Sequence, residues 1–162
     1  MLDVIDTAIL RRLQTEARTS NAEIAREVGL APSAVFERIK KLETKGVLRG
    51  YEARLDPDAL GLSLLAFVFV KADERPGAIR TGEHLAKIPG VLEVHHVAGE
   101  DCYLAKVRVR NAKELGRLLQ DGFGAIPSVT STRSTVVLDT IFETLALAID
   151  EPSSTSVEAE AR

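Results

Sequence analysis

The chain has 162 residues and a formal net charge of −3, with 45% hydrophobic and 28% charged residues. This composition is typical of a globular protein, and the length suffices for one large domain or two small ones. The single cysteine excludes an intrachain disulfide and a cysteine-based metal cluster, which favours a reducing compartment. The longest apolar run, Leu64–Val70, is far shorter than the roughly 20 residues that cross a bilayer, and no signal-peptide pattern opens the chain. We therefore expect a cytoplasmic protein without a membrane segment.

Positive charge is concentrated in the first third of the chain. Residues 1–50 contain nine Lys or Arg and seven Asp or Glu, a net charge of +2, whereas residues 51–162 contain twelve and seventeen, a net charge of −5. Between Ala31 and Arg49 there are five positive and two negative residues. A local basic surface on an acidic protein favours a small DNA contact whose affinity depends on dimerisation.

The chain opens with a predicted helix. Asp3 is a suitable N-cap residue, and the helix is expected to run to about Ala17. Its apolar residues recur at helical spacing and form one buried stripe: Ile5, Ile9, Leu10 and Leu13.

Residues 20–45 predict two more helices joined by a tight turn. Ser20 and Glu23 form an S-x-x-E capping box at the start of the first of these helices. Gly29 ends it, because glycine takes the left-handed conformation without steric cost, and Pro32 suits the first turn of the next helix. This is the layout of a helix-turn-helix, whose second helix enters the DNA major groove.

The helix after Pro32 has two distinct faces. Val35, Ile39 and Leu42 fall on one stripe and are expected in the core. Small polar and positive residues fall on or near the opposite side, where they suit base edges and phosphates. The expected DNA contacts are Ser33, Glu37, Arg38, Lys40 and Lys41, with Arg38 at the edge of the face as a phosphate clamp. The alternative is a solvated amphipathic helix pair without DNA contact.

A short strand is expected over Gly46–Tyr51 as the start of a wing, and turn signals in Asp56–Gly61 mark a domain boundary. The predicted organisation is a helix-turn-helix domain over residues 1–50, a strand and linker over 51–61, a ferredoxin-like domain over 62–149 and a disordered tail over 150–162.

The ferredoxin-like prediction rests on a repeated strand–helix–strand pattern. The first unit is the strand Leu64–Val70, a helix from about Gly77 to Ile88 with Ile79 and Leu85 on its buried face, and a strand from Val91. The second unit is a strand over 102–109, a helix capped at residue 111 and a β-rich run from 129 to about 140. Two such units give βαββαβ and an α+β fold class.

The strand near residue 105 has an apolar and a basic face. Tyr103, Ala105, Val107 and Val109 are expected to face the helices, and Lys106, Arg108 and Arg110 the opposite side. Because a ferredoxin-like sheet has helices on one face only, the apolar residues of Leu64–Val70 need a partner subunit on the other. We expect sheet to pack against sheet, with Ile141–Ile149 as a further strand at a subunit edge.

At this point the chain resembles the Lrp/AsnC, or feast/famine, family of transcriptional regulators over about residues 2–149. The matching segments are Leu2-Asp3, Ile9-Leu10, Glu23-Ile24-Ala25, Val28-Gly29-Leu30, Arg38-Ile39, Leu42-Glu43, Gly46-Val47, Gly50-Tyr51, Leu55-Asp56-Pro57, Leu60-Gly61, Gly99-Glu100 and Tyr103-Leu104. The resemblance implies a homodimer that builds tetramers or octamers, pseudo-palindromic promoter DNA as partner, and a small effector, usually an amino acid, held between dimers. No cofactor or metal is implied.

The resemblance also implies where an effector binds, at Gly99, Glu100, Asp101 and Cys102 and at the strand residues Thr132 and Ser134. Two positions depart from the family pattern. Ala31 stands where a Ser often caps the recognition helix, at a cost of about 1 kcal/mol. Cys102 stands where amino-acid-binding members commonly carry an Asp that faces the ligand's ammonium, and a neutral thiol does not replace that charge.

Other interpretations stay open at this stage. Cys102 is either a redox switch or, more commonly for this residue type, a buried structural residue. His95 and His96 are adjacent and point apart on a strand, so they do not chelate a metal together. An effector-independent regulator, an assembly module without DNA binding and an enzyme resembling sirohaem decarboxylases are the alternatives to an effector-controlled regulator.

Overall fold

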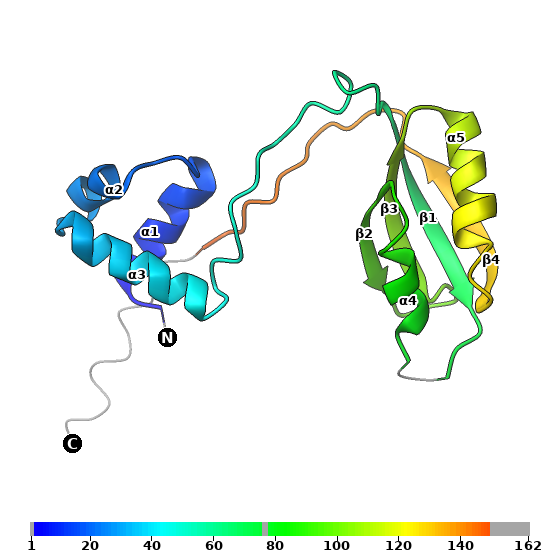
Figure 1. Ribbon diagram of the computed structural model, residues 1–162, viewed down its shortest axis with the longest axis horizontal. Coiled ribbons are helices and arrows are strands. Elements are labelled where there is room, and N and C mark those ends of the chain that lie inside the picture. Colours follow the sequence, from blue (N-terminus) through cyan, green and yellow to red (C-terminus); the bar gives the residue numbers. More distant parts are fainter. Residues whose placement is uncertain (1, 76–77, 150–162) are drawn as a thin grey trace. The chain divides into compact units, whose positions relative to one another are not determined.

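The computed structural model describes residues 2–75 and 78–149, which form two compact units. The first unit runs to Arg54 and also includes the chain from Glu143, and the second unit is Leu55–Phe142. Both are visible in Figure 1 as a helical and a mixed α/β part. The tail predicted over 150–162 lies outside the described residues, and no described helix is long and apolar enough to span a membrane.

The first unit contains three helices, α1 (Val4–Thr15), α2 (Asn21–Val28) and α3 (Pro32–Thr44). Their buried faces meet in one apolar cluster, as the spacing predicted. The buried members are Ile9, Leu10, Leu13, Ile24, Ala25, Val35, Ile39 and Leu42. The predicted capping box of Ser20 and Glu23 is present, and Gly29 closes α2 with a φ of +69°.

The wing strand expected over Gly46–Tyr51 is absent, and the structure has no strand between Lys45 and Ser63. The backbone N–H groups of Val47 and Leu48 both donate to the carbonyl of Leu42 and so close the end of α3. Those two donors are therefore used by the helix terminus and not by a β-ladder.

The second unit is a four-stranded antiparallel sheet with helices on one face. Its strands are β1 (Leu64–Ala72), β2 (Val91–His96), β3 (Tyr103–Val109) and β4 (Val129–Val136), in the order β2-β3-β1-β4. Its helices are α4 (Arg80–Leu85) and α5 (Ala112–Arg117), and α5 continues into a π-helix over Leu118–Phe123. The chain order and sheet order confirm the ferredoxin-like prediction.

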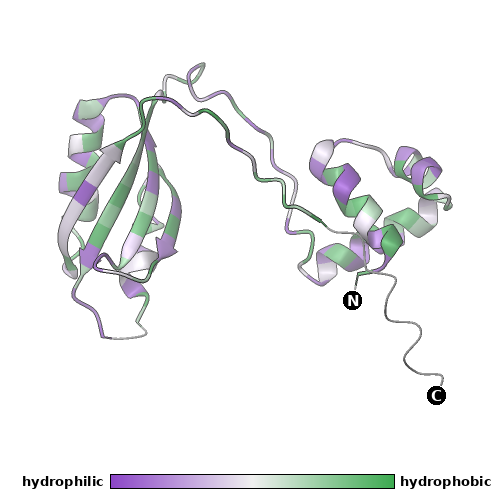
Figure 2. Cartoon of the chain, turned by 180° about the vertical axis from the view of Figure 1, so that it is seen from behind, coloured by the Kyte–Doolittle hydropathy of each residue, from purple (hydrophilic) through white to green (hydrophobic). Residues whose placement is uncertain are grey.

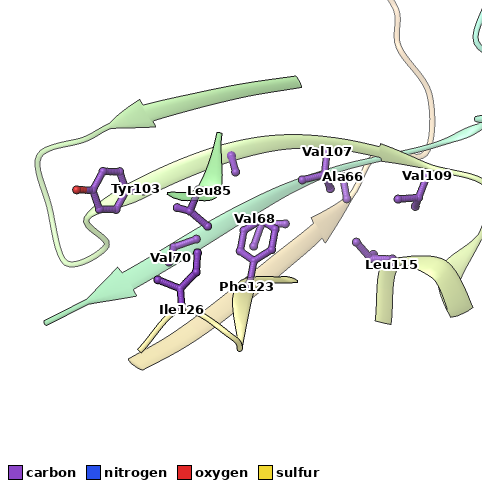
Figure 3. Close-up of a cluster of buried hydrophobic side chains, with 11 residues drawn as sticks. Ala66, Val68, Val70, Leu85, Tyr103, Val107, Val109, Leu115, Phe123 and Ile126 are labelled. Atoms are coloured by element: carbon purple, nitrogen blue, oxygen red, sulfur yellow. The ribbon is translucent and has the colours of Figure 1, made fainter. Parts of the chain in front are cut away.

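The core of this unit lies between the sheet and its helices (Figure 3). Tyr103, Ala105, Val107 and Val109 are all buried, which confirms the predicted apolar face of β3. Phe123 from the π-helix is fully buried among the side chains of the sheet.

Two sequence-based elements differ from the structure. The helix expected from Gly77 to Ile88 is only Arg80–Leu85, and Gly77 itself lies outside the described residues. Ile79 was predicted on the buried face but is exposed, because it is the N-cap residue and precedes the first helical turn.

The strand expected over Ile141–Ile149 is also absent. Its backbone is held instead by side chains of α1, within the first unit. The Arg11 guanidinium donates to the carbonyl of Ile149 at 2.6 and 3.0 Å, and the Gln14 amide both donates to and accepts from the backbone of Leu147. Side-chain partners thus satisfy backbone groups that the prediction had assigned to a sheet edge.

Candidate DNA-binding surface and effector loop

One face of α3 is covered by polar side chains that nothing else in the described chain engages. Ser33, Glu37, Lys40 and Lys41 are all exposed, and the structure gives no ion pair for the two lysines among residues 2–75 and 78–149. The helix begins at Pro32 with the predicted Ala31 N-cap, which supplies no side-chain hydrogen bond. This surface therefore presents a helix start without a side-chain cap and two exposed positive charges to a partner.

Arg38 does not belong to that face. Its Nη1 atom lies 2.6 Å from Asp3 Oδ2 and 2.7 Å from Asp6 Oδ1, so its guanidinium joins α3 to the start of α1. Hydrogen bonds from the Asp6 backbone and from Arg38 lower the pKa of Asp3. The same two carboxylates raise the pKa of Arg38. The positive charge of Arg38, which was expected to bind a phosphate, is thus paired with two carboxylates of its own domain.

Sequence reasoning missed a hollow beside this face. It has a volume of about 480 Å³ and lies where the end of α1, the start of α2 and α3 meet. Its lining is Leu13, Ala17, Thr19, Asn21, Phe36, Ile39, Lys40, Glu43 and Tyr51. The Tyr51 hydroxyl donates to Glu43 Oε1 at 3.0 Å, and burial together with that carboxylate raises the pKa of Tyr51 to about 12.

The second predicted site is the loop between β2 and β3. Gly99 has a φ of +139°, a conformation that a side chain rarely adopts, and it is exposed together with Glu100. Asp101 is already paired, because its Oδ2 atom lies 3.1 Å from Arg133 Nη2. Arg133 also lies over the ring of Phe69, 4.1 Å from its centroid. An incoming ammonium would therefore compete with an arginine for Asp101.

Cys102 is half-buried and packs at the margin of the core. Its thiol donates to the carbonyl of Ala72 at 3.4 Å, and its backbone N–H donates to the carbonyl of Val70. These contacts agree with a structural cysteine.

The predicted residues of β4 do not join the loop directly. Thr132 and Ser134 pair in register with Val70 and Val68, whose side chains face the helices. Arg133 stands between them and points to the opposite face of the sheet, because successive strand residues alternate. It is Arg133, which the sequence did not single out, that connects β4 to the loop.

A partly buried network of hydrogen bonds holds the start of β3, immediately after the loop. The Tyr103 hydroxyl donates to Glu74 Oε2 at 2.7 Å, and the Thr81 backbone N–H donates to Glu74 Oε1 at 2.9 Å. Burial alone would raise the pKa of Glu74, but these hydrogen bonds outweigh it and lower the pKa. Burial and Glu74 raise the pKa of Tyr103 to about 12.

The face of the sheet away from the helices mixes apolar and charged side chains. Figure 2 shows hydrophobic residues along most of β1. Beside them, Lys106 donates to Glu93 Oε1 at 3.2 Å, and His95 lies 3.2 Å from Glu93 Oε2. His96 instead contacts the Tyr103 ring, with centroids 5.2 Å apart, so the two histidines do point apart. No group of side chains in the described chain is arranged to hold a metal ion.

Comparison with protein families gives two matches. Residues 2–43 match the AsnC-type helix-turn-helix domain, and residues 65–147 match the Lrp/AsnC ligand binding domain.

Individual relatives agree. The HTH-type transcriptional regulator FL11 of Pyrococcus horikoshii is 39% identical over 148 residues, which cover 91% of this chain and 97% of that protein. The leucine-responsive regulatory protein of Escherichia coli is 36% identical, with 91% and 92% covered. The feast or famine regulatory protein of Mycobacterium tuberculosis, solved with L-methionine, has a TM-score of 0.84 at 36% identity, with 93% and 100% covered. A Neisseria meningitidis regulator, also solved with L-methionine, has a TM-score of 0.84 at 30% identity, with 93% and 98% covered.

Proposed function

The chain belongs to the Lrp/AsnC family of transcriptional regulators, and from this membership we propose how its own residues serve DNA, effector and assembly. It is a DNA-binding regulator and not an enzyme. We assign promoter recognition to the first unit and effector binding and assembly to the second. A regulator of this kind acts in the cytoplasm, where its promoter DNA is accessible.

The proposed DNA contacts are Ser33 and Glu37 at base edges and Lys40 and Lys41 at phosphates. The observation that carries this proposal is the exposed, unpaired face of α3, which follows a helix-turn-helix layout with a glycine turn and a proline start. N-terminal residues of such a helix reach base edges, whereas lysines further along hold the backbone. Arg38 serves in this proposal as a positioning residue, because its contacts with Asp3 and Asp6 orient α3.

The proposed effector is an amino acid or a related small metabolite at the loop that contains Gly99, Glu100, Asp101 and Cys102. Thr132 and Ser134, whose side chains lie on the opposite face of the sheet from Arg133, would take part only through the backbone of β4. Two solved relatives carry L-methionine. A zwitterion could replace the Asp101–Arg133 contact, with its ammonium on the carboxylate of Asp101 and its carboxylate on the guanidinium of Arg133, if these two new contacts outweigh the ion pair that is broken. The second candidate is an effector-independent regulator, which the absence of an acidic residue at position 102 favours.

The proposed assembly is a homodimer that builds tetramers or octamers. Phe67 and Phe69 lie on the face of the sheet that no helix of the second unit covers, and both are only partly buried. A second copy packed sheet against sheet would remove this apolar surface from water. Light scattering coupled to size-exclusion chromatography measures the assembly directly.

Selection of duplexes from a random DNA pool tests the DNA proposal. The wild-type protein should enrich a pseudo-palindromic sequence, and Ser33→Ala or Glu37→Gln should change the preferred bases. Enrichment of no sequence would refute specific recognition. Unchanged preferences in both variants would refute the residue assignment.

A thermal-shift screen against the common amino acids tests the effector proposal. A ligand that binds only the folded state stabilises it by about 2.7 kcal/mol at a hundredfold excess over its dissociation constant. A shift that Asp101→Asn abolishes would support the loop as the site. If no amino acid shifts the melting temperature, the effector-independent regulator is the better description.

A further inference from the structure

Phe36 is an aromatic side chain that the fold of the first unit leaves unused. It is 51% exposed, whereas the other large apolar side chains of α3, Val35, Ile39 and Leu42, are between 0% and 8% exposed. Phe36 is neither a member of the apolar core nor among the partly buried residues packed on it. Its apolar surface is therefore available to something outside the domain.

Phe36 lies on the side of α3 that carries the proposed DNA contacts. Residues three and four apart are neighbours on a helix surface, so Phe36 is flanked by Ser33 and Lys40. It also lines the hollow that Lys40 shares with Asn21, the first residue of α2. In a helix-turn-helix the recognition helix enters the major groove while the preceding helix crosses the backbone. In the proposed binding mode, Phe36 therefore faces the major groove beside Ser33.

The chemistry of the major groove offers this side chain one apolar partner. Guanine, cytosine and adenine present only hydrogen-bonding groups there, whereas thymine adds a C5-methyl group, which apolar side chains contact. A phenyl ring has no hydrogen-bonding group with which to read the other bases. We propose that Phe36 packs on a thymine methyl and so selects a T·A pair in each half-site. This inference rests on the proposed DNA recognition by α3.

A second copy of the chain is a poorer occupant of this surface. Lys40 flanks the ring and Lys41 lies further round the same helix, and neither has an ionic partner among residues 2–75 and 78–149. Lysine is depleted at the buried centres of protein interfaces, because its charge must be desolvated there. Against DNA, the same lysines meet phosphates while the ring meets a base.

The test uses full-length protein and the duplex that it enriches from a random pool. Each thymine is replaced in turn by deoxyuridine, which removes only the methyl group, and affinity is measured by fluorescence anisotropy. For the wild type, one position per half-site should lose affinity by about fourfold, the equivalent of uncovering one buried CH₂ group. In Phe36→Ala that loss should disappear. Val4→Ala, an exposed apolar residue of α1 that is 63% exposed, is the control and should keep the loss.

The affinities of the wild-type protein for the deoxyuridine-substituted duplexes are sufficient to refute the inference. Indifference to every uracil, while the enriched sequence still binds specifically, would refute the role of Phe36 and leave the proposed function intact. Failure to enrich any sequence would refute both. If replacing thymine by deoxyuridine still lowers the affinity of Phe36→Ala and Phe36→Gln, a residue other than Phe36 contacts the thymine methyl. Loss of self-association in these variants would show that a second copy covers the ring. Phe36→Gln provides the same readout if the alanine variant does not fold.

Discussion

The two basic side chains Lys40 and Arg38 are two residues apart in sequence, yet the structure predicts opposite roles for them. Lys40 is exposed and has no ionic partner in the described chain, whereas Arg38 is paired with Asp3 and Asp6. Replacing Lys40 by Ala should therefore remove a phosphate contact without affecting the fold. Replacing Arg38 by Gln should destabilise the domain without removing a phosphate contact.

The magnitudes follow from counterion release and from the exposure of the ion pairs. Each phosphate contact contributes about 0.9 to the slope of log affinity against log salt. A dimer of Lys40→Ala lacks two such contacts, so the magnitude of its slope should be smaller by about 1.8. Each contact then accounts for about a 3.5-fold change in affinity between 50 and 200 mM salt. The Arg38 pairs are partly exposed, and losing them should cost about 1 kcal/mol, the upper end for such pairs, or about 4–8 °C in melting temperature.

Anisotropy titrations at four salt concentrations and thermal melts of the wild type and both variants provide the comparison. Lys41→Ala, at the other proposed phosphate contact, should show a similar reduction in slope. A reduced salt slope in Arg38→Gln with an unchanged melting temperature would refute the assignment of Arg38 to the fold. An unchanged slope in both lysine variants would show that this face of α3 does not meet phosphates.

Three further predictions concern the second unit. Gly82→Ala would place a Cβ 2.7 Å from Cε1 of the buried Tyr103 ring, so it should lower the free energy of unfolding measured in urea by about 1–2 kcal/mol. Gly116→Ala, with open space around it, should raise that free energy by up to about 1 kcal/mol. Equal effects of the two substitutions would contradict the close approach of Gly82 to Tyr103. Phe123→Ala should cost about 3–5 kcal/mol in the same assay, and a loss below about 1 kcal/mol would mean that the side chain is not buried. Because its folded-state pKa is lowered, ionised Glu74 stabilises the native state fully above its ordinary pKa of 4.5, and that contribution is lost as the pH falls through the folded-state value. Acid titration of stability should therefore show a smaller loss below pH 4.5 in Glu74→Gln, and identical profiles would refute the linkage.

The sequence predicts well where local rules agree with the tertiary structure. The capping box of Ser20 and Glu23, the Gly29 turn and the alternation of Tyr103–Val109 all follow from spacing alone, because a helix cap and a half-buried strand have short-range signatures. The βαββαβ order follows in the same way, since the turn and helix signals between strands are local.

The missed features depend on partners that are far away in sequence. Asp3 and Arg38 are 35 residues apart, and Asp101 and Arg133 are 32 apart. No local pattern predicts these pairs, so the role expected for Arg38 took account of α3 alone, and Arg133 was not singled out at all. The wing strand predicted over Gly46–Tyr51 was wrong because the local signal is ambiguous. Glycine followed by apolar residues after a helix suits a helix C-cap as well as the start of a strand.

The pairing of Arg38 also changes how the first unit binds DNA. With that charge neutralised by two carboxylates, the basic stretch between Ala31 and Arg49 retains four positive side chains, Lys40, Lys41, Lys45 and Arg49, against Glu37 and Glu43. So few cations make few phosphate contacts, and each contact is weakened by salt. A single unit is therefore expected to bind weakly at cellular ionic strength, and specificity must come from base contacts made twice, by two copies on a symmetric site. If the proposed assembly through the second unit is correct, it would be required for tight DNA binding by the first, and the oligomeric state would then be a natural point of control for an effector.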